Sequence, residues 1–301
     1  MVLSAAQKEA VVRRISVEAI RGGDMAVIDE LVRDDFFDHG SPPGAPQGRE
    51  GFKGAIQSLR TAMPDIAPQP MRYVVEGDRV MGQYEGRATH LGDFGGIPPT
   101  GKPVQYLSIE IVELDGDGQV VERWLQMNVM EILQQLGVVP GAPAPWQLGV
   151  PVPDVPAGRV TTPEENKAVF LRHVEDIWNR GDLDAADEIF HPQAVTPYAP
   201  QLPPGPQGCK VVAGMFRSAF GDYRLNVEDI LASGDLVGAR MTNSGTHTGD
   251  LFGIPPTGKA VSFEELAICQ IADGKILASW FQSDQMTMMQ QLGLAPAPGA
   301  A

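Results

Sequence analysis

The heptapeptide GIPPTGK occurs twice in the chain, at Gly96–Lys102 and at Gly253–Lys259. The same offset of 157 residues aligns EGDRV at 76–80 with SGDLV at 233–237. A period this long is typical of a duplicated domain, because solenoid repeats recur about every 20–50 residues. The sequence therefore predicts two domains that share one fold.

The segment between the two copies is rich in proline and glycine and has no periodic apolar pattern, which is typical of a linker. We expect a first domain at 1–139, a linker at 140–160 and a second domain at 161–295. The length of 301 residues is sufficient for two domains of ordinary size.

The same order of elements is predicted in each half. In the second half, Thr162 and Glu165 have the spacing of a capping box, and Pro163 suits a first helical position. From about Met71 and Arg224 onward the pattern changes to short alternating strands, separated by Gly-Asp, Pro-Pro-Thr-Gly and Asp-Gly turns. We therefore expect an α+β fold in which three helices pack on a strongly curved, mostly antiparallel sheet, with a pocket inside the cone.

Composition excludes several classes of function. The formal net charge of −15 disfavours binding to nucleic acid or to an anionic membrane. The sequence shows neither a transmembrane run of about 18 apolar residues nor the features of a secretory signal peptide. Its two cysteines, Cys209 and Cys269, indicate neither a disulfide scaffold nor a metal site. We expect a cytoplasmic protein without a metal ion or other cofactor, and without a nucleic-acid or membrane partner.

A second repeated motif, WLQMNVMEILQQLG at Trp124–Gly137 and WFQSDQMTMMQQLG at Trp280–Gly293, differs at its fifth residue. This residue is Asn128 in the first copy and Asp284 in the second, and only an aspartate can exchange a proton. Either side chain is also a preferred N-cap for the helix that follows. Asn128, with Glu131 three residues later, is interpreted as a cap. The residues alone leave Asp284 open between a cap and an acid/base group.

Strand alternation would place Trp280, Gln282 and Asp284 on one face of the last strand. An aromatic ring, an amide and a carboxylate in a row suit a pocket for a planar ligand with a polar rim. Burial of a carboxyl in such a pocket raises its pKa toward the range in which acid/base catalysis is efficient. The counterparts in the first domain are Trp124, Gln126 and Asn128.

The order of elements, together with THTGDLFGIPPTGKAV, the DGKI turn and SWFQSDQMTMMQQLG, resembles the SnoaL-like polyketide cyclase and ester cyclase family, which has the NTF2-like fold. The resemblance covers nearly all of both halves. It implies a cone-shaped α+β barrel with a deep apolar pocket in each half, and ring closure by aldol condensation without metal or cofactor. It also implies that Asp284 holds the acid/base position.

Other residues are weaker candidates. His247 and its counterpart His90 are interpreted as histidines that fasten the Pro-Pro-Thr-Gly turn. The alternative makes His247 a catalytic candidate, either as a hydrogen-bond partner of a substrate oxygen or as a proton donor beside the carboxylate.

Glu264 and Glu265 interrupt an apolar strand, and an inward-facing glutamate such as Glu265 would form a paired-carboxylate site with Asp284. The alternative is that both glutamates lie near the sheet edge in water. In the first half, Glu110 lies in a different register from Glu265.

Three residues of the second half have alternative interpretations. Arg240 is interpreted as the partner of a neighbouring acid, with binding of an anionic substrate group as the alternative. Trp178 and Tyr198 have no aromatic counterparts in the first half. They are interpreted as residues of the core or of the pocket rim, and the alternative is that they line the pocket and contact the ligand.

These features favour a cofactor-free acid/base enzyme that acts on a small apolar or aromatic carbonyl compound, such as a polyketide-like substrate. Aldol-type cyclisation or proton transfer would take place in the second domain. A non-catalytic small-molecule binding protein is the alternative, and an epoxide-hydrolase-like enzyme using Arg240 is a third. Because such folds often pair through their sheets, we expect the two halves to form a pseudo-dimer within the chain, and a homodimer remains open.

Overall fold

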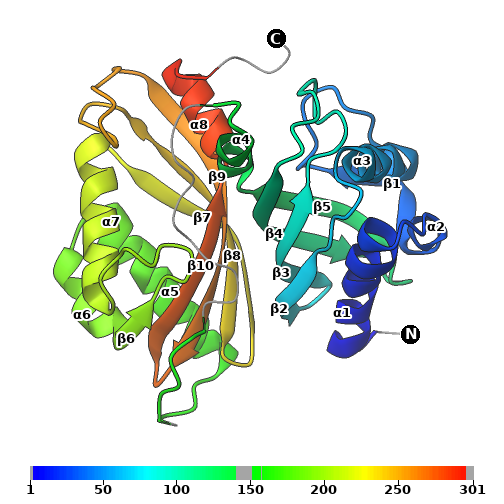
Figure 1. The fold of residues 1–301 in the computed structure, drawn as a ribbon. Coiled ribbons are helices and arrows are strands. Elements are labelled where there is room, and N and C mark those ends of the chain that lie inside the picture. Colours follow the sequence, from blue (N-terminus) through cyan, green and yellow to red (C-terminus); the bar gives the residue numbers. More distant parts are fainter. Residues whose placement is uncertain (1–2, 140–150, 157, 296–301) are drawn as a thin grey trace. The chain divides into compact units, whose positions relative to one another are not determined.

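The computed structural model describes residues 3–139, 151–156 and 158–295. The chain divides into two compact units, Met1–Ala144 (unit one) and Pro145–Ala301 (unit two), and each is described by itself (Figure 1). Most of the predicted linker lies outside the described residues.

Unit one begins with helices and continues into a sheet. Its helical segments are α1 (Ala5–Arg14), the π-helix η1 (Ile15–Arg21), α2 (Ala26–Leu31), α3 (Gly48–Ala62) and α4 (Val129–Leu136). Its strands are β1 (Val32–Asp38), β2 (Gln69–Glu76), β3 (Arg79–Thr89), β4 (Pro103–Leu114) and β5 (Val120–Met127).

Unit two repeats this order. Its helical segments are α5 (Pro163–Arg172), the π-helix η2 (His173–Arg180), the 3₁₀-helix η3 (Leu183–Ala185), α6 (Ala186–Ile189), α7 (Pro206–Ala219) and α8 (Gln285–Leu292). Its strands are β6 (Phe190–Val195), β7 (Arg224–Ser233), β8 (Leu236–Thr246), β9 (Ala260–Ala272) and β10 (Lys275–Ser283).

Each unit holds a five-stranded sheet, in the order β1-β5-β4-β3-β2 in unit one and β6-β10-β9-β8-β7 in unit two. The last four strands of each unit form the antiparallel meander that the sequence predicts. The edge strands β1 and β6 pair in parallel with β5 and β10. The sequence analysis missed both edge strands, because each is short and continues directly from a helix.

The first helix of each unit starts as predicted. Ser4 and Thr162 form capping boxes with Gln7 and Glu165, so that both ends of each box satisfy a backbone N–H group. Each helix then continues as a π-helical segment, η1 or η2. A π-helix aligns residues five apart in the sequence, which matters for the side chains of η2 described below.

Helices α5, α6 and α7 cover one face of the unit-two sheet (Figure 1). The core between them includes Phe170 from α5 and Ile189 from α6, together with Val261, Phe263 and Ala267 from β9. Because strand residues alternate between faces, the odd-numbered residues of β9 point toward the helices. We call this helix-covered side of each sheet the inner face, and the opposite side the outer face.

Candidate active site

Glu265 lies on the inner face of β9, between Phe263 and Ala267. Its neighbours on the adjacent strands are Met241 of β8 and Ser283 of β10. Phe263, Ala267 and Met241 are buried, whereas Glu265 keeps partial solvent access. A carboxyl group on a largely apolar inner face is placed where an interior ligand would meet it.

A buried hydrogen-bonded pair, Asn243 of β8 and Tyr223 just before β7, lies beside Glu265. The Tyr223 hydroxyl donates to Asn243 Oδ1, and both residues are almost fully buried. The Asn243 amide is close enough to Glu265 to affect its pKa. Within the described chain, however, Asn243 Nδ2 makes no hydrogen bond of normal geometry, so a small rotation would be needed to pair it with the carboxyl.

Asn243 and Tyr223 were not among the residues predicted from the sequence. A signal for Asn243 exists, because it follows Val237, Ala239 and Met241 as a polar residue in an apolar alternating series. Tyr223 precedes the strand pattern and gives no comparable signal. Its position depends on contacts with residues distant in the sequence.

Burial raises the pKa of Glu265 from its ordinary value of 4.5 to about 7, and the Asn243 amide opposes part of this rise. Near neutral pH, Glu265 therefore exchanges readily between its protonated and ionised forms, which suits a general acid or base. The rise comes from burial and not from a second carboxylate. The structure thus does not support the expected split of pKa values between Glu265 and Asp284.

Aromatic side chains surround the Tyr223 ring. The ring centroids of Trp178, Phe216 and Phe220 lie 5.7, 5.7 and 6.1 Å from it. Trp178 Nε1 donates to His173 Nε2 over 2.7 Å, a contact between residues five apart in the π-helix η2. Burial lowers the pKa of His173 to about 4, so its ring stays a neutral acceptor. Trp178 therefore packs next to the polar pair, and its contact with a ligand stays a prediction.

Asp284 directly follows β10 and caps helix α8. Its Oδ1 accepts a hydrogen bond of 2.9 Å from the backbone N–H of Thr287. Its own backbone N–H donates to the Glu264 carbonyl over 2.9 Å, which holds Asp284 beside β9 at the level of Glu264, one residue before Glu265. The side chain is half-buried. Asp284 is thus a helix cap, and its acid/base role stays a prediction.

The capping interpretation is wrong for Asn128, whose side chain makes no cap hydrogen bond to α4. Its Oδ1 instead accepts from the Leu107 N–H over 2.9 Å, and its Nδ2 donates to Glu131 Oε2 over 2.7 Å. Only an amide can do both, because an aspartate would bring a second carboxylate against Glu131. The difference between Asn128 and Asp284 therefore follows from the residue three positions later, which is Glu131 in unit one and Thr287 in unit two.

Trp280 and Gln282 lie on the outer face of β10, where they pair with Ile268 and Leu266 of β9. The expectation that they line the same interior pocket as an inner-face carboxyl such as Glu265 is therefore wrong. Alternation groups residues correctly, but it does not show which group faces the helices. The corresponding unit-one residues behave alike, since Trp124 and Gln126 pair with the outer-face residues Ile111 and Ile109.

His247 and His90 are fully buried and fasten the turn formed by the repeated heptapeptide. The Nδ1 atom of His247 accepts from the backbone N–H of Thr257 over 3.2 Å, and that of His90 accepts from Thr100 over 3.3 Å. This matches the structural interpretation, and a catalytic role of His247 stays a prediction. The Nε2 atoms of both rings are buried without a hydrogen-bond partner among the described residues.

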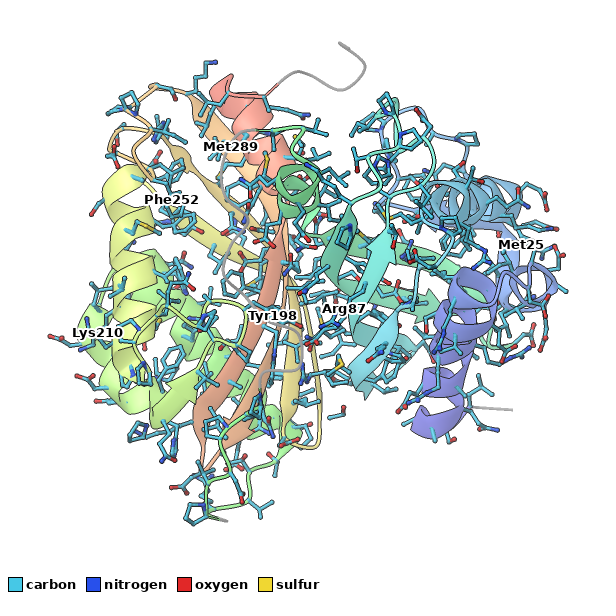
Figure 2. The ribbon with its side chains drawn as sticks, in the orientation of Figure 1. Met25, Arg87, Tyr198, Lys210, Phe252 and Met289 are labelled. Atoms are coloured by element: carbon cyan, nitrogen blue, oxygen red, sulfur yellow. The ribbon has the colours of Figure 1, made fainter. Side chains whose placement is uncertain are left out.

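Arg240 lies on the outer face, opposite Leu266. Its guanidinium is 3.4 Å from Glu264 and 3.8 Å from Asp229, so it pairs with neighbouring acids as expected. It does not supply the inner-face cation that an epoxide-hydrolase-like site would need. Tyr198 is half-buried on the loop between β6 and α7 (Figure 2).

Unit one is built differently at the equivalent positions. The offset of 157 residues replaces Glu265, Asn243 and Tyr223 by Ser108, Gly86 and Ile66. A Cβ atom at Gly86 would collide with the hydroxyl end of the Tyr106 ring, so this ring lies directly over the glycine. A phenol ring thus fills the space in unit one where unit two carries the Asn243 side chain.

Glu110 lies on the inner face of unit one but is held in an ion pair. Its Oε2 is 2.7 Å from Arg123 Nε, and Arg123 Nη1 is 3.2 Å from Asp38 Oδ2. All three side chains are nearly buried. At the Glu110 position unit two has Ala267, so the two units do not share this acidic group.

The described part of the chain holds no group of three or more histidine, cysteine, aspartate or glutamate residues that could bind a metal ion. No helix there is long and apolar enough to cross a membrane.

Comparison with known proteins gives matches to both units. A family model described as SnoaL-like polyketide cyclase matches residues 10–136 and 168–292. The chain is 32% identical over 119 residues to the nogalonic acid methyl ester cyclase of Streptomyces nogalater, and this alignment covers 38% of the chain and 89% of the relative. It is 29% identical over 129 residues to the aklanonic acid methyl ester cyclase DnrD of Streptomyces peucetius, and this alignment covers 41% of the chain and 88% of the relative. The structure of TsrD from Streptomyces laurentii aligns with a TM-score of 0.43 and 28% identity, over 45% of this chain and 99% of that one.

Proposed function

Since the chain belongs to the SnoaL-like polyketide cyclase family and is an enzyme of that type, we propose that unit two closes a ring in a carbonyl substrate by cofactor-free acid/base chemistry. The observation that carries this proposal is Glu265. Its side chain lies on the inner face of β9, where burial raises its pKa to about 7. Ser108 at the same position favours unit two over unit one as the site of the chemistry.

The proposed reaction is an intramolecular aldol addition. A base removes a proton from the carbon next to one carbonyl group, and the resulting enolate carbon attacks a second carbonyl group. The alkoxide formed there then takes up a proton. One C–H bond and the π bond of the attacked carbonyl group break while one C–C and one O–H bond form, so the product has the composition of the substrate and no oxidant or reductant is needed.

We assign the base to Asp284 and the acid to Glu265. Asp284 comes one residue after Ser283, which pairs with Glu265 across the sheet, so the two carboxyl groups start from neighbouring backbone positions. The cap bond engages Asp284 Oδ1, and Oδ2 would take the substrate proton. Glu265, protonated below about pH 7, would donate to the alkoxide. General acid or base catalysis contributes roughly 10²–10⁴-fold in rate.

The substrate class follows from the surroundings of the Tyr223 ring. Trp178, Phe216 and Phe220 provide apolar ring surfaces near the polar pair, which suits a flat aromatic compound. Two relatives are named as cyclases of nogalonic and aklanonic acid methyl esters. We therefore propose these two esters as the first substrates to test.

The test is a cyclisation assay with each ester in the presence of a metal chelator, analysed by chromatography and mass spectrometry. The wild-type protein should convert at least one ester to a product of unchanged mass. Asp284→Asn should lower kcat by about 10²-fold or more. The matched change in unit one, Asn128→Asp, should leave kcat per folded molecule unchanged.

Two results would contradict the proposal. Full turnover by Asp284→Asn would show that Asp284 is not the base. Absence of a cyclised product from both esters with the folded wild-type protein would contradict the cyclase assignment, and bound but unconverted ester would favour a non-catalytic binding protein.

A further inference from the structure

Asn243 carries a buried hydrogen-bond donor that the acid/base roles above do not use. The residue is 1% exposed, and its Oδ1 accepts from the Tyr223 hydroxyl. Its Nδ2 is buried without a hydrogen bond of normal geometry to any described residue. A buried donor without a hydrogen bond destabilises the folded state, so this arrangement does not serve the stability of the fold.

The neighbours of Asn243 determine where its donor points. Because Oδ1 is held by Tyr223, the NH₂ group turns to the other side of the amide, where it lies beside the Glu265 carboxyl. A substrate oxygen placed between the two side chains would accept one hydrogen bond from Asn243 Nδ2. It would accept a second from Glu265 whenever that carboxyl carries its proton.

We propose that Asn243 Nδ2, oriented by Tyr223, binds the substrate oxygen that becomes the enolate, and that this oxygen belongs to a planar aromatic ketone or phenol. The inference rests on the proposed function, because it concerns an oxygen atom of the same reaction. A donor aimed at a developing oxyanion typically contributes about 10²–10³-fold in kcat. In this account Asn243 is a catalytic residue and Tyr223 is a positioning residue.

Unit one cannot supply this donor. Its counterpart of Asn243 is Gly86, and the Tyr106 ring occupies the space above that glycine. Its counterpart of Tyr223 is Ile66, which has no hydroxyl group. The donor and the residue that orients it are therefore present together in unit two and absent together from the aligned positions of unit one.

The kinetic test compares three variants with the wild type on nogalonic acid methyl ester. Asn243→Leu removes the donor at similar volume and should lower kcat by about 10²–10³-fold, with a change in KM below about tenfold. Tyr223→Phe keeps the ring but releases the amide, and it should lower kcat less, with KM again nearly constant. Ser244→Ala, the next residue along β8 and on the outer face, is the control and should behave as the wild type.

A second measurement does not depend on turnover. At pH 6 the probe 4-nitrophenol should bind the wild type and Ser244→Ala, as followed by calorimetry and by the absorbance of the bound phenol. Asn243→Leu should bind it about tenfold more weakly, as expected for one lost hydrogen bond of about 1.4 kcal/mol. Asn243→Ala replaces Asn243→Leu if circular dichroism shows that the leucine variant does not fold.

Equal affinity of the Asn243 variant and the wild type for 4-nitrophenol would overturn the inference, as would absence of binding to the wild type. If the wild-type protein binds the probe through Asn243 but cyclises neither ester, the role of Asn243 as a hydrogen-bond donor is supported and the proposed reaction is contradicted. If Asn243→Leu leaves cyclisation unaffected, the proposed reaction is supported and the role of Asn243 is contradicted.

Discussion

Asn128 and Asp284 occupy aligned positions and make different hydrogen bonds, because the residues three positions later differ. Asn128 donates to the Glu131 carboxylate, whereas Asp284 accepts from the backbone of Thr287. An acidic side chain is compatible with the second setting and not with the first. The difference between Asn128 and Asp284 therefore depends on the residue three positions later, and by itself it does not indicate that unit two is active.

Asn128→Asp should destabilise unit one. The new carboxylate would lie against Glu131 in place of a 2.7 Å hydrogen bond, within a mostly buried site. We expect the free energy of unfolding to fall by about 1–3 kcal/mol, measured by urea denaturation. Combining Asn128→Asp with Glu131→Thr recreates the unit-two pair and should restore most of the loss.

An equal loss in the single and the double variant would show that Glu131 is not the reason for an asparagine in unit one. Asp284→Asn provides the matched comparison in unit two. It should change stability by less than about 0.5 kcal/mol, because asparagine and aspartate are similar N-caps.

Glu265 should make stability depend on pH. Its pKa is about 7 in the folded protein and 4.5 ordinarily, so the unfolded chain releases the proton at lower pH than the folded one. The stabilising contribution is complete below about pH 4.5 and is lost as the pH rises through 7. At about 1.4 kcal/mol for each pKa unit, the rise from 4.5 to about 7 makes the loss at most about 3.5 kcal/mol.

Glu265→Gln should remove this pH-dependent loss, so that the variant becomes more stable than the wild type at pH 8. Urea denaturation between pH 4.5 and pH 8 measures the free energy of unfolding of both proteins. Parallel stability curves for the two proteins over this range would show that Glu265 is not held protonated by burial.

At the scale of helices and strands, local patterns predicted most of the fold. The capping boxes at Ser4 and Thr162, the antiparallel meander and the turn role of the heptapeptide all depend on residues close in the sequence. The edge strands β1 and β6 depend on pairing with β5 and β10, which are distant in the sequence, and were missed.

The site was predictable only in part for the same reason. Glu265 was a candidate from its place in β9, but its burial and its pKa depend on Asn243 and Tyr223, which come from other elements. Trp280 and Gln282 share a face as predicted, yet helix packing makes it the outer face. Alternation alone contains no information on which side the helices cover.

The heptapeptide turns should each lose stability when their histidine is removed. His90→Ala and His247→Ala leave the N–H groups of Thr100 and Thr257 without their acceptor and open a space in a buried region. We expect each change to lower the free energy of unfolding by about 1–3 kcal/mol. Denaturation of both variants checks this, and a loss in only one unit would contradict a shared structural role.

At the scale of the whole molecule, duplication has preserved one architecture and changed its interior. Unit one is closed around the ion pairs of Arg123 with Glu110 and Asp38 and around the Tyr106 ring. Unit two carries small or apolar residues at the ion-pair positions and the Tyr223–Asn243 pair beside Glu265. We propose that unit one is retained for structure and unit two for chemistry, and the pseudo-dimer remains a prediction.

Arg123→Ala should separate these roles. It leaves Glu110 and Asp38 buried without their cation, which typically costs about 3–5 kcal/mol. Calorimetry should show a large loss of stability in unit one. Cyclisation per folded molecule should stay unchanged, and a loss of kcat in the folded variant would show that unit one takes part in the reaction.

The most direct test of the central claim is kcat for ester cyclisation by Glu265→Gln beside its control, Glu264→Gln. The two changes remove the same charge from adjacent residues of β9, one on the inner and one on the outer face. We predict that Glu265→Gln lowers kcat by about 10²–10⁴-fold and that Glu264→Gln retains wild-type kcat. Equal kcat values for the two variants would contradict an acid/base site at the inner face of unit two.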